Sequence, residues 1–225
     1  MTASILTIDA GNTRVKWGLF DDAGKLLEQC ACLNTELANL RLPHANQVVI
    51  SNVAGSNIET QLKQLLTKHA RVQWVRSEKS ACGVQNSYTQ AEKLGTDRWA
   101  ALIAAWHMQQ AACVVVNAGT AITIDALNDA TFMGGLIMPG VDLMQQSLYL
   151  ATAQLPIEGD KKSDVGIFAT NTQDAIYAGT LHAITGAIVQ MAHSLSQQSK
   201  QAPYILINGG NAPIIYNQLR KTNLT

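Results

Sequence analysis

The feature that most constrains the fold is a short pattern that occurs twice along the chain. Leu6–Thr13 and Val114–Ala121 each contain an apolar run that ends in Asp or Asn, followed by Gly and a hydroxyl or amide side chain. The two copies lie about half the chain apart, which is typical of a duplicated unit. If the glycine turns of the two halves face one another, they form a cleft between two domains, where ligands commonly bind.

The rest of the pattern predicts an α/β chain, because short β-branched runs alternate with longer amphipathic segments. We predict strands at Ile5–Ile8, Val15–Leu19, Lys25–Cys32, Gln47–Ser51, Val72–Arg76, Cys113–Val116, Ile122–Leu127, Thr131–Ile137 and Tyr204–Ile207. We predict helices at Ser56–Ala70, Thr96–Gln110 and Asp174–Ser196, and an irregular segment at Ser77–Lys93. The predicted domains are residues 1–112 and 113–225.

Composition excludes several classes of function. Sixteen basic and sixteen acidic residues cancel among 225, so the chain lacks the basic surface that nucleic-acid binding needs. No run of about 18 apolar residues predicts a membrane span, and the first residues do not resemble a signal peptide. The four cysteines match no zinc or disulfide spacing, which favours reduced thiols in a cytoplasmic protein. The low charged fraction, 14%, hints at surface buried between subunits.

The first glycine turn suits phosphate. Gly11 lets the backbone approach a ligand closely, and Asn12 and Thr13 add polar side chains. Successive backbone N–H groups at such a turn form a concavity for anionic oxygens. Asp9 offers a hard oxygen ligand for Mg²⁺, and Lys16 offers a positive charge. The alternative is an ordinary β-hairpin, because Gly-Asn turns also occur there.

Two further glycine turns follow in the second half. Gly119-Thr120-Ala121 is compatible with phosphate, and Gly209-Gly210 follows the last predicted strand. Two facing turns suit a metal-bound triphosphate, with the third turn at the nucleoside end. The set therefore favours nucleotide binding more strongly than any one turn does.

The catalytic candidate is Gly95-Thr96-Asp97-Arg98 at the start of a predicted helix. The Asp97 carboxylate is a potential base for an acceptor hydroxyl, and the neighbouring Arg98 could orient a substrate or spread charge. The alternative is purely structural, since Thr96 is a good N-cap and Asp97 suits the helix dipole.

Taken together, the motifs resemble the type III pantothenate kinases over nearly the whole chain. They are Asp9–Thr13, Gly95–Arg98, Gly119–Ala121 and Gly134–Gly140, in this order. The resemblance implies two duplicated actin-like (ribonuclease H-like) domains, usually paired as a homodimer. It also implies ATP-dependent phosphorylation of pantothenate to 4′-phosphopantothenate, the first step of coenzyme A biosynthesis.

The resemblance further implies roles for individual residues. ATP contacts fall on Asp9, Ala10, Gly11, Asn12, Thr13, Arg14, Val15, Lys16 and Thr120, with Mg²⁺ at Asp9. Pantothenate contacts fall on Tyr88, Gly95, Thr96, Asp97, Arg98 and Thr172, and Asp97 is the proton acceptor. The family usually has an aspartate where this chain has Asn117, at a site for a monovalent cation. The neutral amide leaves dependence on K⁺ or NH₄⁺ open.

Two other readings stay open at this point. In the first, the chain is a related actin-fold kinase or phosphatase that acts on another hydroxyl or on polyphosphate. In the second, it is a regulatory accessory protein that binds ATP or pantothenate without turnover. The presence of both Asp97 and Arg98 favours an enzyme over the accessory protein.

Overall fold

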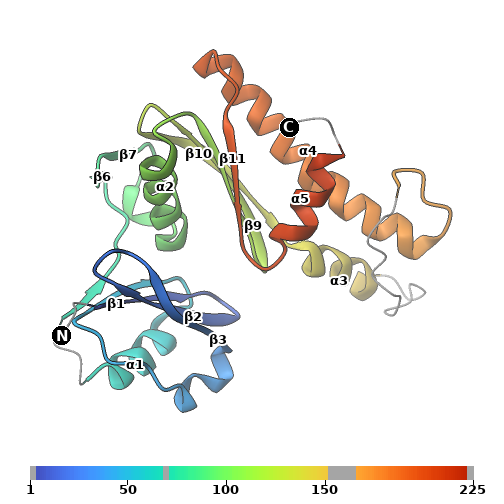
Figure 1. The fold of residues 1–225 in the computed structure, drawn as a ribbon. Helices are drawn as coiled ribbons and strands as arrows, with labels where there is room; N and C mark the ends of the chain where they lie inside the picture. Colours follow the sequence, from blue (N-terminus) through green and yellow to red (C-terminus); the bar gives the residue numbers. More distant parts are fainter. Residues whose placement is uncertain (1–3, 68–70, 152–165, 222–225) are drawn as a thin grey trace. The chain divides into compact units, whose positions relative to one another are not determined.

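A computed structural model describes residues 4–67, 71–151 and 166–221, and its chain divides into two compact units (Figure 1). The first unit holds residues 1–79 and 88–101, and the second holds residues 80–87 and 102–225. Helix α2 (Thr96–Gln109) begins in the first unit and ends in the second. The boundary between residues 112 and 113 stays a prediction.

The first unit is built on a five-stranded mixed sheet. Its strands are β1 (Ser4–Ala10), β2 (Arg14–Asp21), β3 (Leu26–Leu33), β4 (Gln47–Asn52) and β5 (Val72–Trp74). They lie in the order β3-β2-β1-β4-β5, with β1 antiparallel to β2 and parallel to β4. The predicted strands of the first half are thus present within a few residues.

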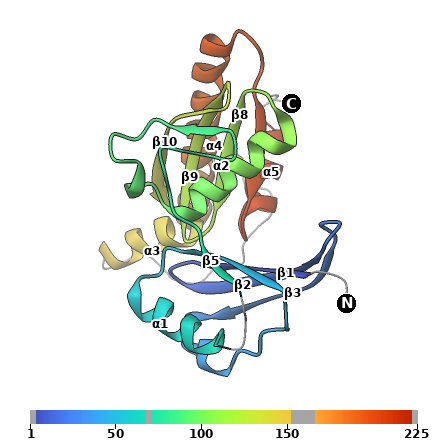
Figure 2. The same cartoon turned by 90° about the vertical axis from the view of Figure 1, so that its left-hand side faces the viewer.

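One face of this sheet carries the core of the first unit. Leu6, Ile8 and Ala10 alternate with more exposed residues along β1 and are almost completely buried. They pack with Leu37 of the 3₁₀ helix η1 (Asn34–Asn39) and with apolar residues of α1 (Ser56–Leu65). Figure 2 shows η1 and α1 together on one side of the sheet. The period-two pattern that predicts β1 also directs these side chains to the core.

The second unit is built on a six-stranded mixed sheet. Its strands are β6 (Ser80–Ala81), β7 (Val84–Asn86), β8 (Cys113–Ala118), β9 (Ala121–Asn128), β10 (Thr131–Pro139) and β11 (Tyr204–Asn208). Their order is β11-β8-β9-β10-β7-β6, with β8 antiparallel to β9 and parallel to β11. The helices that lie wholly in this unit are α3 (Val141–Ala151), α4 (Thr172–Ser199) and α5 (Ala212–Arg220).

Helix α4 is the core helix of the second unit. Leu181, Ile184 and Ile188 are buried against Val114, Val116 and other residues of β8 and β9. Within the described residues, α4 alone is long and apolar enough to cross a membrane by length and composition. Its packing into this core gives a sufficient reason for that composition.

The segment predicted to be irregular, Ser77–Lys93, contains two short strands and the one-turn 3₁₀ helix η2 (Ala91–Lys93), so this prediction is wrong in part. Strands β6 and β7 form a hairpin whose two turn residues, Cys82 and Gly83, have φ angles of 49° and 78°. Positive φ at both central positions is typical of a tight type I′ turn. Strand β7 then adds to the edge of the second sheet beside β10.

The two units repeat one arrangement of strands, which confirms the predicted duplication. In each sheet the third, second, first and fourth strands of the repeat lie side by side: β3-β2-β1-β4 and β10-β9-β8-β11. The strand ends correspond as well, since Val53 N donates to Ala10 O in one unit and Asn211 N donates to Ala118 O in the other. The first glycine turn and the second therefore occupy equivalent positions.

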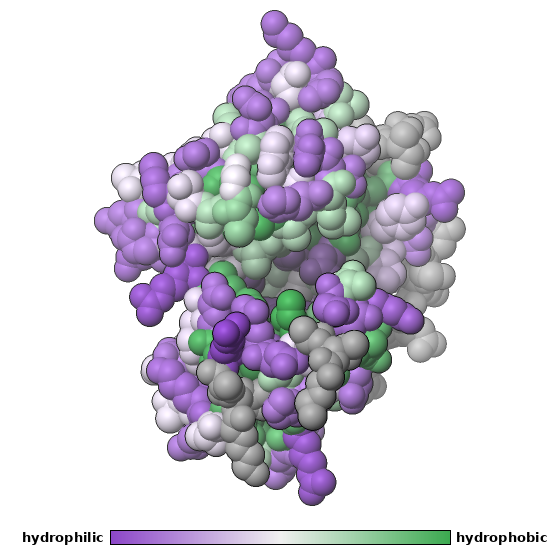
Figure 3. All heavy atoms as spheres, turned by 60° about the vertical axis from the view of Figure 1, so that its left-hand side comes forward, coloured by the Kyte–Doolittle hydropathy of each residue, from purple (hydrophilic) through white to green (hydrophobic). Residues whose placement is uncertain are grey.

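The surface mixes polar and apolar residues. Hydrophilic side chains are scattered over the face in Figure 3, with apolar side chains between them. Such mixing is ordinary for a folded chain, because a large share of any protein surface is apolar.

Candidate active site

The first glycine turn joins β1 to β2 and sets Asp9 beside Lys16. Gly11 N donates to Arg14 O at 3.0 Å, which closes the turn. Asp9 and Lys16 are direct cross-strand partners, with Lys16 Nζ 4.0 Å from Asp9 Oδ2. Each side chain is about half exposed, at 50% and 52%. Both groups are therefore within reach of a ligand and are partly screened by water.

The pKa of Asp9 is raised above its ordinary value. Burial of the carboxyl group is the largest cause, and the negative charge of Asp97 adds to it, while Lys16 opposes both. The negative charge of Asp97 thus acts on Asp9 in addition to the effect of burial. A cation that binds between a carboxylate and phosphate oxygens would relieve this unfavourable charge.

The start of α2 lies beside the carboxyl end of β4. The hydroxyl groups of Ser51 and Thr96 are hydrogen-bonded at 3.0 Å, and Thr96 Oγ1 also donates to Asn52 O at 3.4 Å. Because Ser51 is the direct partner of Asp9 across β1 and β4, Thr96 is brought to the strand end that carries the first turn. Gly95-Thr96-Asp97-Arg98 and Asp9–Lys16 therefore belong to one site region of the first unit.

Gly95 is needed for the conformation of Asp97. A Cβ atom at residue 95 would lie 2.6 Å from Asp97 Oδ1, closer than real Cβ atoms approach an oxygen. The same Oδ1 accepts a hydrogen bond from Arg98 N at 2.8 Å. The carboxylate thus folds back over the first turn of α2, which agrees with the structural alternative for Asp97. It does not exclude a chemical role, because a carboxylate oxygen accepts more than one hydrogen bond.

Arg98 is held firmly against Tyr88. Its Nη1 donates to the Tyr88 hydroxyl at 2.9 Å, and its guanidinium carbon lies 5.6 Å from the centre of the Tyr88 ring. Arg98 is only 4% exposed, so its planar cation is fixed in orientation. Two of the residues that the resemblance assigns to pantothenate, Tyr88 and Arg98, are therefore direct neighbours.

In the second unit, two other glycine segments pack on the second glycine turn. Gly119 N donates to Ala121 O at 3.1 Å, and Gly140 N donates to Thr120 O at 2.8 Å. A Cβ atom on Gly140 would collide with the carbonyl oxygens of Gly119 and Thr120. Gly209, at a φ of 107°, packs equally closely on the end of β8, where a Cβ atom would lie 2.5 Å from Ala118 O. The second and third turns of the sequence prediction therefore meet.

Asn117 stands at the end of β8 among neutral polar groups. Its Nδ2 donates to Thr123 Oγ1 at 3.3 Å, and its partner across β11 is Asn208. Asn117 thus offers a cation an amide oxygen without a charge. A cation site there stays a prediction.

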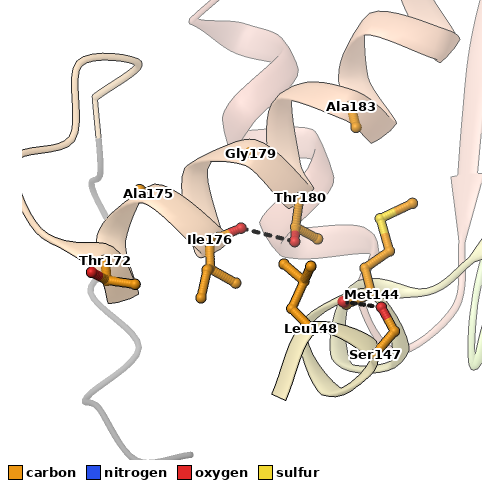
Figure 4. A pocket seen from close by; sticks show the side chains of 9 residues that line it. All are labelled: Met144, Ser147, Leu148, Thr172, Ala175, Ile176, Gly179, Thr180 and Ala183. Carbon is orange, nitrogen blue, oxygen red and sulfur yellow. Dashed lines mark hydrogen bonds between the residues drawn. The ribbon is translucent and has the colours of Figure 1, made fainter. Parts of the chain in front are cut away.

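Thr172 is the first residue of α4 and belongs to the second unit. Asn171 caps the helix by accepting a hydrogen bond from Asp174 N at 2.9 Å. Thr172 lines a pocket of about 490 Å³ between α3 and α4 (Figure 4). The other lining residues are Met144, Ser147, Leu148, Ala175, Ile176, Gly179, Thr180 and Ala183. The remaining predicted pantothenate contacts belong to the first unit.

The sequence interpretation misses one residue next to the first turn. The side chain of Asn34 donates to Gly11 O and to Asn12 O, both at 3.0 Å. Twenty or more residues separate these partners along the chain, and no local pattern around Asn34 predicts the contact.

Comparison with known proteins gives a consistent result. The family model described as type III pantothenate kinase matches residues 5–194. A type III pantothenate kinase of Nitrosospira multiformis is 43% identical over 227 residues, covering 97% of this chain and 85% of its own length. One from Methylobacillus flagellatus is 40% identical, with 96% and 88% covered.

Solved structures with low sequence identity share the fold. A protein of Campylobacter jejuni described as a candidate Baf family transcriptional activator has a TM-score of 0.62 at 21% identity, covering 94% of this chain and 86% of its own. A protein of Listeria monocytogenes described as a candidate N-acetylmannosamine kinase has a TM-score of 0.50 at 15% identity, with 97% and 88% covered. At such identities the likeness concerns the fold alone, and that fold is the actin-like α/β fold predicted from the sequence.

Proposed function

The chain belongs to the type III pantothenate kinase family, and from this premise we propose that it transfers the γ-phosphoryl group of ATP to the primary hydroxyl of pantothenate. This reaction is the first step of coenzyme A biosynthesis. The observation that carries the proposal is the arrangement in the first unit. There a glycine turn, an Asp9–Lys16 pair and the Asp97 carboxylate lie at one end of a sheet.

We assign the phosphates of ATP to the first turn. Backbone N–H groups of the turn bind the phosphate oxygens. Lys16 adds a positive charge that is already in position before the nucleotide binds. Asp9 is the residue that would hold Mg²⁺, through its carboxylate. No group of three His, Cys, Asp or Glu side chains suited to a metal occurs in the part of the chain that the structure describes. One carboxylate supplemented by phosphate and water oxygens is an ordinary Mg²⁺ environment, and the bound ion neutralises phosphate charge.

Asp97 accepts the proton of the pantothenate hydroxyl. Asp97 follows Thr96, which binds Ser51, the strand partner of Asp9. This supports an acceptor end of the site near the phosphate end, as transfer requires. Arg98, fixed by Tyr88, binds the pantothenate carboxylate, because a planar guanidinium matches that group in two hydrogen bonds. The absence of a side chain at Gly95 leaves room for the Asp97 carboxylate in this position.

The second unit supplies further contacts in this proposal. Thr120 of the second glycine turn binds ATP, and Thr172 binds pantothenate. Asn117 is a ligand for a monovalent cation only through its amide oxygen, so a strong dependence on K⁺ is not expected.

We further propose that the protein is a cytoplasmic homodimer. The walls of the α3–α4 pocket support a dimer surface there, because the exposed face of α4 carries the small residues Ala175, Gly179 and Ala183. Two leucines of α3 are also exposed: Leu148, which lines the pocket, is 42% exposed, and Leu150 is 89% exposed. Exposed apolar side chains that gather on one face mark a candidate surface for a partner. The four free cysteines suit a reducing compartment.

The replacement Asp97→Asn tests the proposal. We expect kcat to fall about 10²–10⁴-fold, because a general base contributes that much, with the KM for ATP little changed. Glu59→Gln is the matched control, since it removes a carboxylate from the first turn of α1 that pairs with Lys63. Circular dichroism shows whether each variant folds. A folded Asp97→Asn enzyme with wild-type turnover would exclude Asp97 as the base.

A further inference from the structure

All three carbonyl groups of the first glycine turn are hydrogen-bonded to one residue, Asn34. Its side-chain Nδ2 donates to Gly11 O and Asn12 O, and its backbone N donates to Thr13 O at 3.1 Å. Asn34 lies immediately after β3, where η1 begins. The backbone bond to Thr13 continues the pairing of β2 with β3, whereas the two side-chain bonds reach past that pairing to the turn between β1 and β2.

The direction of these bonds fixes the direction of the turn amides. The peptide bonds of the described chain are trans, so each C=O points opposite to the N–H of the next residue. Since the carbonyls of Gly11 and Asn12 point toward Asn34, the N–H groups of Asn12 and Thr13 point together away from it. Two successive N–H groups with a common direction make the anion-binding concavity.

We propose that Asn34 is a positioning residue for the nucleotide phosphates, acting through the backbone of the first turn. The inference rests on the proposed role of this turn in ATP binding and adds the group that orients it. The orientation of the Asn34 amide is determined, because the reversed amide would set its oxygen against two carbonyl oxygens. Its Oδ1 is buried without a partner among the described residues, so the amide serves as a donor alone.

In the second unit, too, the residue that follows the third strand is hydrogen-bonded to the glycine turn, but this residue is a glycine. Gly140 follows β10 as Asn34 follows β3, and its backbone N donates to Thr120 O as that of Asn34 donates to Thr13 O. A side chain on Gly140 would strike the turn carbonyls, whereas in the first unit a side chain reaches the turn carbonyls and binds them. The residue after the third strand thus contacts the glycine turn in both units.

Replacement of Asn34 by Ala tests the inference. Loss of two hydrogen bonds to the turn should weaken binding of Mg·ATP, measured with a non-hydrolysable analogue by calorimetry, about 10-fold. The KM for pantothenate should stay within about twofold, because the Asp97 side of the site is not bound to Asn34. Asn34→Asp keeps the shape without the donor, and should weaken nucleotide binding at least as much.

Asn46→Ala is the control for a loss of stability alone. Asn46 also binds the backbone of β1 through its side chain, with Oδ1 accepting from Ser4 N at 2.8 Å, but at the opposite end of the strand. If Asn34→Ala affects nucleotide binding no more than Asn46→Ala does, Asn34 is structural and the inference is wrong.

Lys16→Ala, measured in parallel, separates this inference from the proposal on which it rests. Weaker nucleotide binding in Lys16→Ala with unchanged binding in Asn34→Ala would overturn the role of Asn34 alone. Unchanged binding in both would overturn the phosphate role of the turn itself. The inference is supported if both variants bind nucleotide more weakly. It also requires that the backbone amide NMR signals of Asn12 and Thr13 shift on nucleotide binding in the wild type and not in the variants.

Discussion

Asp9 and Lys16 carry opposite charges on neighbouring strands. At 4.0 Å and about half exposed, the pair adds little to stability because water screens it. Its consequence is for ionisation, since Lys16 is the one group that opposes the upward shift in the pKa of Asp9. The local charge balance is therefore suited to an added cation.

Removal of Lys16 should change how Mg²⁺-dependent nucleotide binding responds to pH. In the proposed site, Asp9 must be ionised to hold the metal. Because its pKa is raised, binding is expected to weaken as the pH falls through that pKa. Without Lys16 the pKa rises further, and the acidic limb of the binding curve should move to higher pH. Lys63→Ala is the matched control, because Lys63 pairs with Glu59 on α1. The acidic limb of the binding curve of this variant should coincide with that of the wild type. An identical limb in Lys16→Ala would show that Asp9 does not govern metal binding.

Among the residues of the site, those in sequence motifs could be predicted and those brought in by tertiary packing could not. The turn Asp9–Lys16 and Gly95–Arg98 stand out because glycine and charged residues are adjacent in the chain. Asn34 reaches the turn because β3 pairs with β2 and returns the chain beside it. Single-sequence patterns do not contain such contacts.

At the scale of elements, the glycine segments of the second unit differ in what they tolerate. Gly209 has a positive φ and packs on the backbone of Ala118, while a Cβ atom on the next residue, Gly210, would meet nothing within 4 Å. The turn after β11 therefore depends on one glycine of the pair.

Gly209→Ala should destabilise the protein by about 1–3 kcal/mol, because the added methyl group collides with backbone that has no room to move. Gly210→Ala should change the free energy of unfolding by less than about 0.5 kcal/mol, as most exposed substitutions do. Urea unfolding of both variants measures the difference. Equal stabilities would contradict the close packing of Gly209 on β8.

The elements that could be predicted are those with a clear period. Alternation in β1 and β2 and the buried run of β8 are well marked, and the long helix is found at Thr172–Ser199. The hairpin β6–β7 is too short to show a period, and its turn depends on a positive φ at Cys82 that no sequence rule requires. Helices α3 and α5 and the 3₁₀ helix η1 are also absent from the sequence prediction. The predicted end of the helix that begins at Ser56 lies outside the described residues.

At the scale of the whole molecule, one strand arrangement is used twice with different loops. The first copy joins its leading strands by a three-residue turn braced by an asparagine, and the second by a two-residue turn braced by a glycine. Duplication explains why the sequence pattern recurs, and later divergence of the two copies explains why their turns differ in length and in the residue that binds them. The cleft predicted between facing turns stays a prediction.

A homodimer formed through the α3–α4 face should be sensitive to charge there. Ala183 is exposed on α4 and lines the pocket, so Ala183→Arg should shift the mass in solution from dimer to monomer. Gln64→Arg on exposed α1 is the control and should leave the mass unchanged. Light scattering after gel filtration gives the mass. A dimer in both variants would exclude this face.

The most direct test is mass spectrometry of the products formed from Mg·ATP and a panel of alcohols that includes pantothenate. A type III pantothenate kinase should convert pantothenate to its 4′-phosphate together with stoichiometric ADP, faster than any other acceptor in the panel. If another alcohol is the better substrate, or if nucleotide binds and no acceptor is phosphorylated, the assigned reaction is wrong.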